Sequence, residues 1–121
     1  MTKKESEKLF AKTYFYNDTF RMFYHFTDSK EEYDKMMEWI GSPTPKNIHG
    51  RCVLAENGGD IRIMIGIFND DLATLAHESI HAALFTLEAV GQKLGYEDEL
   101  LPYLSEYIFR ECQKKIKCHK A

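Results

Sequence analysis

The first half of the chain alternates short runs of aromatic residues with polar breaks. Residues 13–16 and 20–26 are rich in Tyr and Phe, and an Asn-Asp pair lies between them. Aromatic residues favour β-strands, and Asn and Asp favour tight turns, so this pattern predicts a β-hairpin. His25 lies in the second of these strands, where we expect it to be structural and not a metal ligand. The first ten residues are mostly polar and predict a flexible lead-in.

A second hairpin is predicted in the middle of the chain. Two apolar runs, 51–55 and 61–68, flank an Asn-Gly-Gly-Asp turn, which is a strong short-range signal for a hairpin. Every second residue from Ile61 to Ile67 is isoleucine, which gives the second strand one continuous apolar face. The opposite face carries Gly66, which predicts a bulge or the close approach of another segment.

Helical spacing of apolar residues first appears after Ser29. Ser29 and Glu32 form a capping-box pattern, which predicts a helix that runs to about Ile40. Four apolar residues share one face of it and should pack in the core: Tyr33, Met36, Met37 and Ile40. A Gly-Ser-Pro-Thr-Pro stretch then ends the helix and opens a loop.

Two further helices are predicted in the last third of the chain. Asn69, Asp70 and Asp71 offer N-caps for a long helix, which Gly91 or Gly95 should end. Its apolar residues at three-four spacing predict a core face of Leu72, Ala76, Ile80, Ala83, Leu87 and Val90. A last helix begins near Asp98 in this interpretation. Its predicted core face is Leu101, Leu104, Tyr107 and Ile108.

The predicted element order, β-β-α-β-β-α-α, indicates one α+β domain over residues 1–121 with a small antiparallel sheet. Hydrophobic residues make up 44% of the chain and charged residues 29%, which is typical of globular proteins and not of disordered ones. The net charge of −3, with acids and bases mixed along the chain, disfavours a nucleic-acid-binding surface.

The expected location follows from the distribution of apolar and charged residues. No apolar run reaches the roughly 20 residues of a membrane-spanning helix, so no membrane partner is expected. The first ten residues are charged and lack the apolar core of a signal peptide, which favours the cytoplasm. Three cysteines without a secretion signal favour reduced thiols over disulfides.

The candidate chemistry lies in the stretch His77-Glu78-Ser79-Ile80-His81, an H-E-x-x-H motif. On a helix, residues four apart share one face, so both imidazoles can bind one metal ion. Glu78 is offset by about 100° and can instead take a proton from a metal-bound water. Zinc is the expected metal, since it makes such a water acidic and polarises a substrate carbonyl.

The surroundings of the motif support the zinc hypothesis, because the helix around the histidines is uncharged and apolar. Two unpaired histidines buried in such a helix would each cost about 1–3 kcal/mol. The third ligand stays open on these grounds. Leu84 and Leu87 replace the residues of the longer metzincin pattern, which is therefore excluded. The remaining candidates are carboxylates near or on the last predicted helix, Glu97, Glu99 and Glu106.

Residues 71–85, together with Gly91 and residues 98–108, resemble the small metallopeptidase-like proteins that phages and prophages encode. These proteins are zincin-like, of the gluzincin type, and the resemblance covers roughly residues 47–110. It implies a strand hairpin, an H-E-x-x-H helix and a following helix that supplies the third ligand. By this resemblance the zinc ligands are His77, His81 and Glu99, and Glu78 is the catalytic base. Pro102 departs from the family pattern, in which a small residue is usual.

Two functions are therefore expected. The first is a zinc-dependent metallopeptidase that hydrolyses peptide or protein substrates, and the second is a catalytically inactive zincin-like protein that binds a host or phage protein. In the first, an oxyanion would be stabilised by a tyrosine or a histidine, and among the nearby tyrosines the sequence does not choose between Tyr96, Tyr103 and Tyr107. The strand over residues 61–68 would pair with an extended substrate if it is an edge strand.

Overall fold

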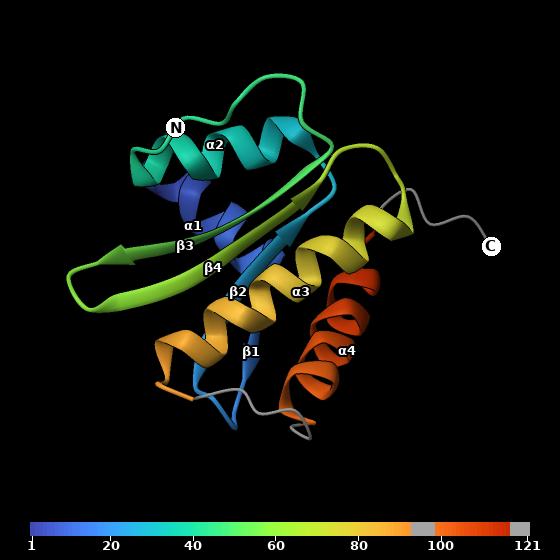
Figure 1. The fold of residues 1–121 in the computed structure, drawn as a ribbon. Helices are drawn as coiled ribbons and strands as arrows, with labels where there is room; N and C mark the ends of the chain where they lie inside the picture. Colours follow the sequence, from blue (N-terminus) through green and yellow to red (C-terminus); the bar gives the residue numbers. More distant parts are fainter. Residues whose placement is uncertain (93–98, 117–121) are drawn as a thin grey trace.

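The chain forms one mixed sheet of four strands between two layers of helices (Figure 1). This computed structural model describes residues 1–92 and 99–116. In chain order, the elements are α1 (Lys3–Thr13), β1 (Tyr14–Asn17), β2 (Met22–Thr27), α2 (Lys30–Ile40), β3 (Gly50–Asn57), β4 (Asp60–Ile67), α3 (Leu72–Ala89) and α4 (Leu100–Gln113). From Tyr14 onwards this is the predicted order of elements. In the described ranges, no helix has the length and apolar character that crossing a membrane requires.

The first ten residues are not a lead-in, because they form most of α1. Thr2 and Glu5 make a capping box, in which each side chain accepts a hydrogen bond from the backbone N–H of the other residue. Leu9 is buried and packs with α2, as part of the core between the two helices and the sheet. The apolar pattern of this helix is too sparse to reveal it, because its buried face is mostly supplied by Ser6, Leu9 and Thr13.

The sheet is mixed and not antiparallel as expected. Its strand order is β1-β2-β4-β3, and both predicted hairpins pair antiparallel within themselves. The two hairpins join through β2 and β4, which run parallel, with Phe26 opposite Ile65. The intervening α2 gives the chain the long crossover that a parallel pair needs. Strand β4 is therefore central, which excludes it as an edge strand, and β3 and β1 form the two edges.

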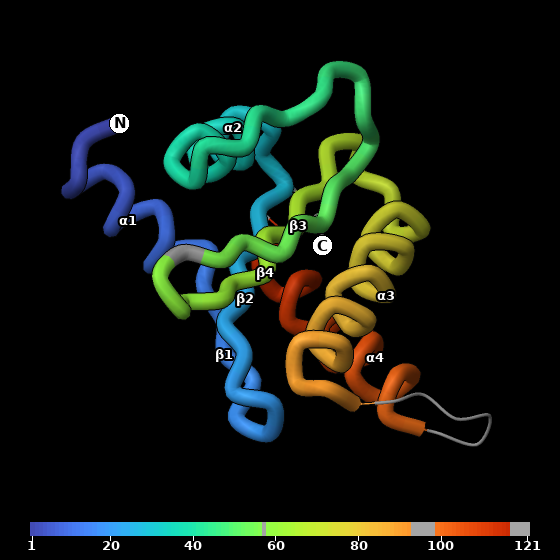
Figure 2. Tube along the Cα trace, turned by 60° about the vertical axis from the view of Figure 1, so that its left-hand side comes forward, coloured from blue at the N-terminus to red at the C-terminus, as the bar shows by residue number. Residues whose placement is uncertain are grey.

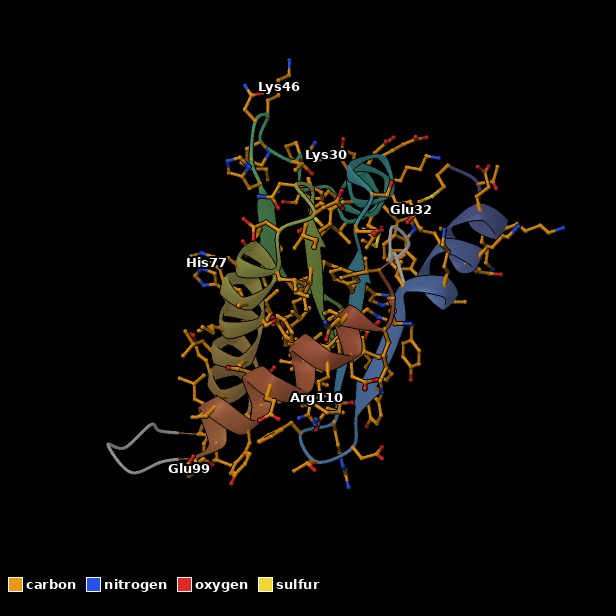
Figure 3. All side chains as sticks on the ribbon, turned by 90° about the vertical axis from the view of Figure 1, so that its right-hand side faces the viewer. Lys30, Glu32, Lys46, His77, Glu99 and Arg110 are labelled. Atoms are coloured by element: carbon orange, nitrogen blue, oxygen red, sulfur yellow. The ribbon has the colours of Figure 1, made fainter. Side chains whose placement is uncertain are left out.

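Two cores lie on opposite faces of β4, and the edge-on view in Figure 3 shows the two helical layers that cover them. The predicted isoleucine face is confirmed, since Ile63, Ile65 and Ile67 pack under α3 and α4. On the other face, Met64 packs with the predicted stripe of α2. A Cβ at Gly66 would lie 2.6 Å from Cδ1 of Tyr33, which belongs to α2. The close approach predicted at Gly66 is therefore that of α2 to the sheet.

The last two helices lie side by side and run in opposite directions (Figure 2). Helix α3 ends at Ala89, and Gly91 has the left-handed backbone typical of a helix stop. Helix α4 buries Leu104 and Ile108, as predicted, and Cys112 as well. Gly95 and the expected start of this helix near Asp98 lie outside the described residues.

The predicted core face of α3 is largely wrong. The buried residues are Leu75, Glu78, Ser79, Ala82, Ala83, Thr86 and Leu87, of which the prediction named Ala83 and Leu87. Leu72, Ile80 and Val90 are instead 50%, 46% and 44% exposed. Apolar residues occur all round this helix, so their spacing fits more than one face, and contact with β3, β4 and α4 decides between them.

Candidate metal centre

The histidine motif lies in the middle turns of α3, and that helix is fixed at its start by side-chain hydrogen bonds. The Asp71 carboxylate accepts a hydrogen bond from the backbone N–H of Ala73, at 2.9 Å. Asn69 in turn accepts one from the backbone N–H of Asp71, at 3.2 Å. Of the three predicted N-caps, Asp71 is therefore the one used, and it holds the first turn of the helix in place.

His77 and His81 point into solvent from one face of α3, and Figure 3 shows His77 directed away from the body of the molecule. Their Nε2 atoms lie 3.1 Å apart. Two nitrogens bound to one tetrahedral zinc at about 2.0–2.1 Å lie roughly 3.3–3.4 Å from each other. The pair therefore fits one shared zinc ion with only a small adjustment of the rings.

The cost of burial does not favour zinc binding here, contrary to the expectation from the sequence. Because both histidines are exposed, neither carries the cost of burying an unpaired polar group. At 3.1 Å one neutral imidazole can also donate a hydrogen bond to the other. The geometric fit of the two Nε2 atoms, and not the cost of burial, is thus what favours a metal.

Glu78 lies on the buried side of the same helix and is only 7% exposed. Burial raises the pKa of its carboxyl group, and the neighbouring His77 and His81 partly offset this rise. A carboxyl group with a raised pKa is suited to accept and release a proton near neutral pH. In the part of the chain that the structure describes, no group donates a hydrogen bond to this carboxylate.

A shallow hollow of about 550 Å³ opens beside the motif, between α3 and the start of β3. His77, Glu78 and Thr74 line it from the helix, and His49 and Gly50 are among the residues that line it from the other side. A Cβ at Gly50 would lie 2.7 Å from Thr74 Cγ2 and 3.2 Å from Glu78 Cγ, so only glycine lets β3 come this close. The sequence patterns did not reveal His49 or Gly50, because His49 lies in a loop without periodicity and Gly50 is the first residue of β3, ahead of the predicted strand over residues 51–55.

The structure does not bring Glu99 to the histidines. Figure 3 shows Glu99 near the C-terminal end of α3, well away from His77, because α4 starts where α3 finishes. His77 lies twelve residues before Ala89, which is about 18 Å along a helix axis at 1.5 Å per residue. Glu106 is exposed and pairs with Arg110, while Glu97 lies outside the described residues. Within residues 1–92 and 99–116, no three His, Cys, Asp or Glu side chains form a metal-binding group.

The candidate oxyanion-stabilising tyrosines are also placed away from the motif or are not described. The Tyr107 hydroxyl donates a hydrogen bond to the backbone carbonyl of Tyr16, at 2.9 Å, which ties it to β1. Tyr103 is 67% exposed on α4. Tyr96 lies outside the described residues. The described site therefore consists of His77, His81 and Glu78 beside the hollow.

Comparisons with family models, with curated proteins and with solved structures found no match to this chain. The function is therefore inferred from the geometry of α3 and β3.

Proposed function

We propose that this protein is a zinc-dependent metallopeptidase of the zincin-like kind, with His77 and His81 as zinc ligands and Glu78 as its general base. The observation that supports this most directly is the 3.1 Å separation of the two Nε2 atoms. A phage or prophage origin and substrates in the cytoplasm of a bacterial host belong to the same proposal. Glu99 is not retained as the third ligand, since it lies at the far end of α3.

The chain's own contribution to hydrolysis would come mainly from Glu78. Bound zinc would supply Lewis acidity, which activates a water molecule and polarises the scissile carbonyl. The Glu78 carboxylate would take the proton of the attacking water and pass it to the departing amine. Glu78 lines the hollow, where an incoming peptide would pass beside it.

An extended substrate would be held by β3 and not by the strand over residues 61–68. Strand β3 is an edge of the sheet, and it begins at Gly50, which also lines the hollow. A free strand edge offers backbone groups that an extended peptide can pair with. Such a peptide would run past Glu78, because Gly50 and Glu78 both line the hollow.

Replacement of Glu78 by glutamine tests this proposal. The change removes the proton acceptor and keeps the shape, so we expect zinc content to stay the same and peptide cleavage to fall by roughly 10²–10⁴-fold. Cleavage of a peptide library by the zinc-loaded protein is the measurement, with Glu88→Gln on the exposed end of the same helix as the matched control. Cleavage that survives Glu78→Gln would contradict the assignment.

The second candidate is a catalytically inactive zincin-like protein that binds a host or phage protein. Two observations favour it, namely that the described residues supply no third ligand and that the hollow is shallow. It predicts a stoichiometric complex with a protein partner that Glu78→Gln leaves intact. A pull-down with both forms of the protein distinguishes it from the peptidase.

A further inference from the structure

Between Leu72 and Leu84, the outward face of α3 is an exposed helical surface without charge; Glu88, one turn further along the helix, is the next exposed charged residue on that side. From Leu72 to Leu84 no exposed residue is Asp, Glu, Lys or Arg, and Ile80 and Leu84 are 46% and 37% exposed. We call this surface the α3 face; it consists of Ala73, Ala76, His77, Ile80, His81 and Leu84. By contrast, α2 carries ion pairs on its exposed side, as an ordinary surface helix does.

The two histidines in the middle of the α3 face make up half of a zinc site. Zinc in a structural site takes four ligands in a tetrahedron. His77 and His81 provide two nitrogens at a suitable separation, and no described carboxylate, cysteine or histidine joins them. Both histidines are exposed, so the remaining ligands can come from another molecule.

We propose that a second copy of this chain supplies them, so that one zinc ion is held by His77 and His81 of two chains across a two-fold axis. Such an axis through the metal doubles every ligand, and two nitrogens become the four that zinc needs. A face without charge can meet itself without repulsion between like charges. Ile80 and Leu84, exposed beside the histidines, would be shielded from water by the same contact.

This dimer and the proposed peptidase use the same histidines in different ways. Zinc held by four imidazoles has no open position, so the dimer is a closed form that does not hydrolyse peptides. The inference depends on the zinc affinity of His77 and His81, which it shares with the proposed function, and does not depend on cleavage. The two proposals can therefore fail separately.

The test measures mass and zinc content of the full chain after chelator treatment and stepwise addition of zinc chloride. We expect the mass to double from 14.2 kDa, with saturation at one zinc per two chains. Light scattering and elemental analysis give the two values. His77→Ala and His81→Ala should abolish both changes, and Glu78→Gln should leave both intact.

A second pair of variants tests the α3 face itself. Leu84→Glu places two like charges at the dimer contact, so we expect the zinc-dependent dimer to weaken at least tenfold. Leu72→Glu is the matched control: this leucine is 50% exposed on the same helix, but it lies about 140° around the axis from His77. We expect Leu72→Glu to dimerise as the wild type does.

Three outcomes would overturn the inference. A monomer that binds one zinc ion would contradict the dimer. Peptide cleavage by this zinc-bound monomer would still support the proposed peptidase. A dimer that persists in the histidine variants, or that Leu84→Glu leaves unchanged, would place the contact elsewhere. No zinc binding at all would reject both proposals.

Discussion

His25 is a buried histidine that the fold keeps neutral. Its Nε2 atom lies 2.9 Å from an Arg62 guanidinium nitrogen, and its Nδ1 lies 3.0 Å from the Thr13 hydroxyl. Since guanidinium can only donate, Nε2 must accept, and the ring carries its proton on Nδ1. Burial and then the positive charge of Arg62 lower the pKa of this ring to about 4. The structural role expected from the sequence is thus confirmed.

The lowered pKa of His25 makes the free energy of unfolding depend on pH. The unfolded chain takes up the proton near pH 6.5 and the folded chain only near pH 4. The contribution of His25 to the free energy of unfolding is therefore full above pH 6.5 and is lost as the pH falls from 6.5 to 4. Between pH 7.5 and 4.5 we expect a loss on the order of 2–3 kcal/mol from this group. Urea unfolding at both values measures it.

The matched comparison uses two histidine variants. His25→Gln should lose this part of the pH dependence, while His49→Gln, at an exposed position, should keep it. An unchanged pH dependence in His25→Gln would show that another group is responsible.

Gly50 is a glycine that sets the distance between two elements, β3 and α3. A methyl group there would meet the Thr74 side chain at 2.7 Å and the backbone oxygen of Gly66 at 3.0 Å. We expect Gly50→Ala to lower the free energy of unfolding by about 1–3 kcal/mol, because the strand must move away from the helix. Urea unfolding of the variant and the wild type gives the value.

A double-mutant cycle identifies the cause of that loss. Thr74→Ala removes the nearer contact, so the double variant should be more stable than the sum of the single changes predicts. Strict additivity would show that Gly50→Ala acts through the backbone oxygen of Gly66 or through strand conformation instead.

Local sequence signals predicted most of the helices and strands, but they predicted less well how these elements pack together. The Ser29 cap, the two hairpins and the Gly91 stop are each encoded by a few adjacent residues, and all are present. Helix α1 lacks an apolar stripe and was not predicted, although its capping box, Thr2 with Glu5, is a local signal for a helix start. The buried face of α3 and the parallel pairing of β2 with β4 depend on packing between distant segments, which local patterns do not report.

At the scale of the whole molecule, the parts of the candidate site that depend on neighbouring residues were predictable, and the parts that depend on packing were not. The histidine pair was predictable because the spacing i and i+4 alone brings two side chains together on a helix. A third ligand from α4 was not predictable, because the position of any such side chain depends on how α4 packs against α3. The antiparallel arrangement of these helices puts Glu99 at the far end of α3.

Zinc binding should also stabilise the whole molecule. A ligand that binds only the folded chain, at a hundred times its Kd, adds about 2.7 kcal/mol, which corresponds to a rise in Tm of roughly 10 °C for a domain of this size. Thermal unfolding with zinc and with a chelator measures the difference. The double variant His77→Ala/His81→Ala should show no rise, and an equal Tm for the wild type in both conditions would exclude a specific site.

The parallel pairing of β2 with β4 has a consequence for the order in which the protein folds. Partners in this pair, such as Phe26 and Ile65, are 39 residues apart, whereas each hairpin closes through neighbouring residues. During synthesis β2 therefore emerges with one edge unpaired and with Phe26 uncovered, until β4 has followed. Both cores need β4, so neither half of the chain can complete its packing alone. Assembly of the sheet is the step that joins them.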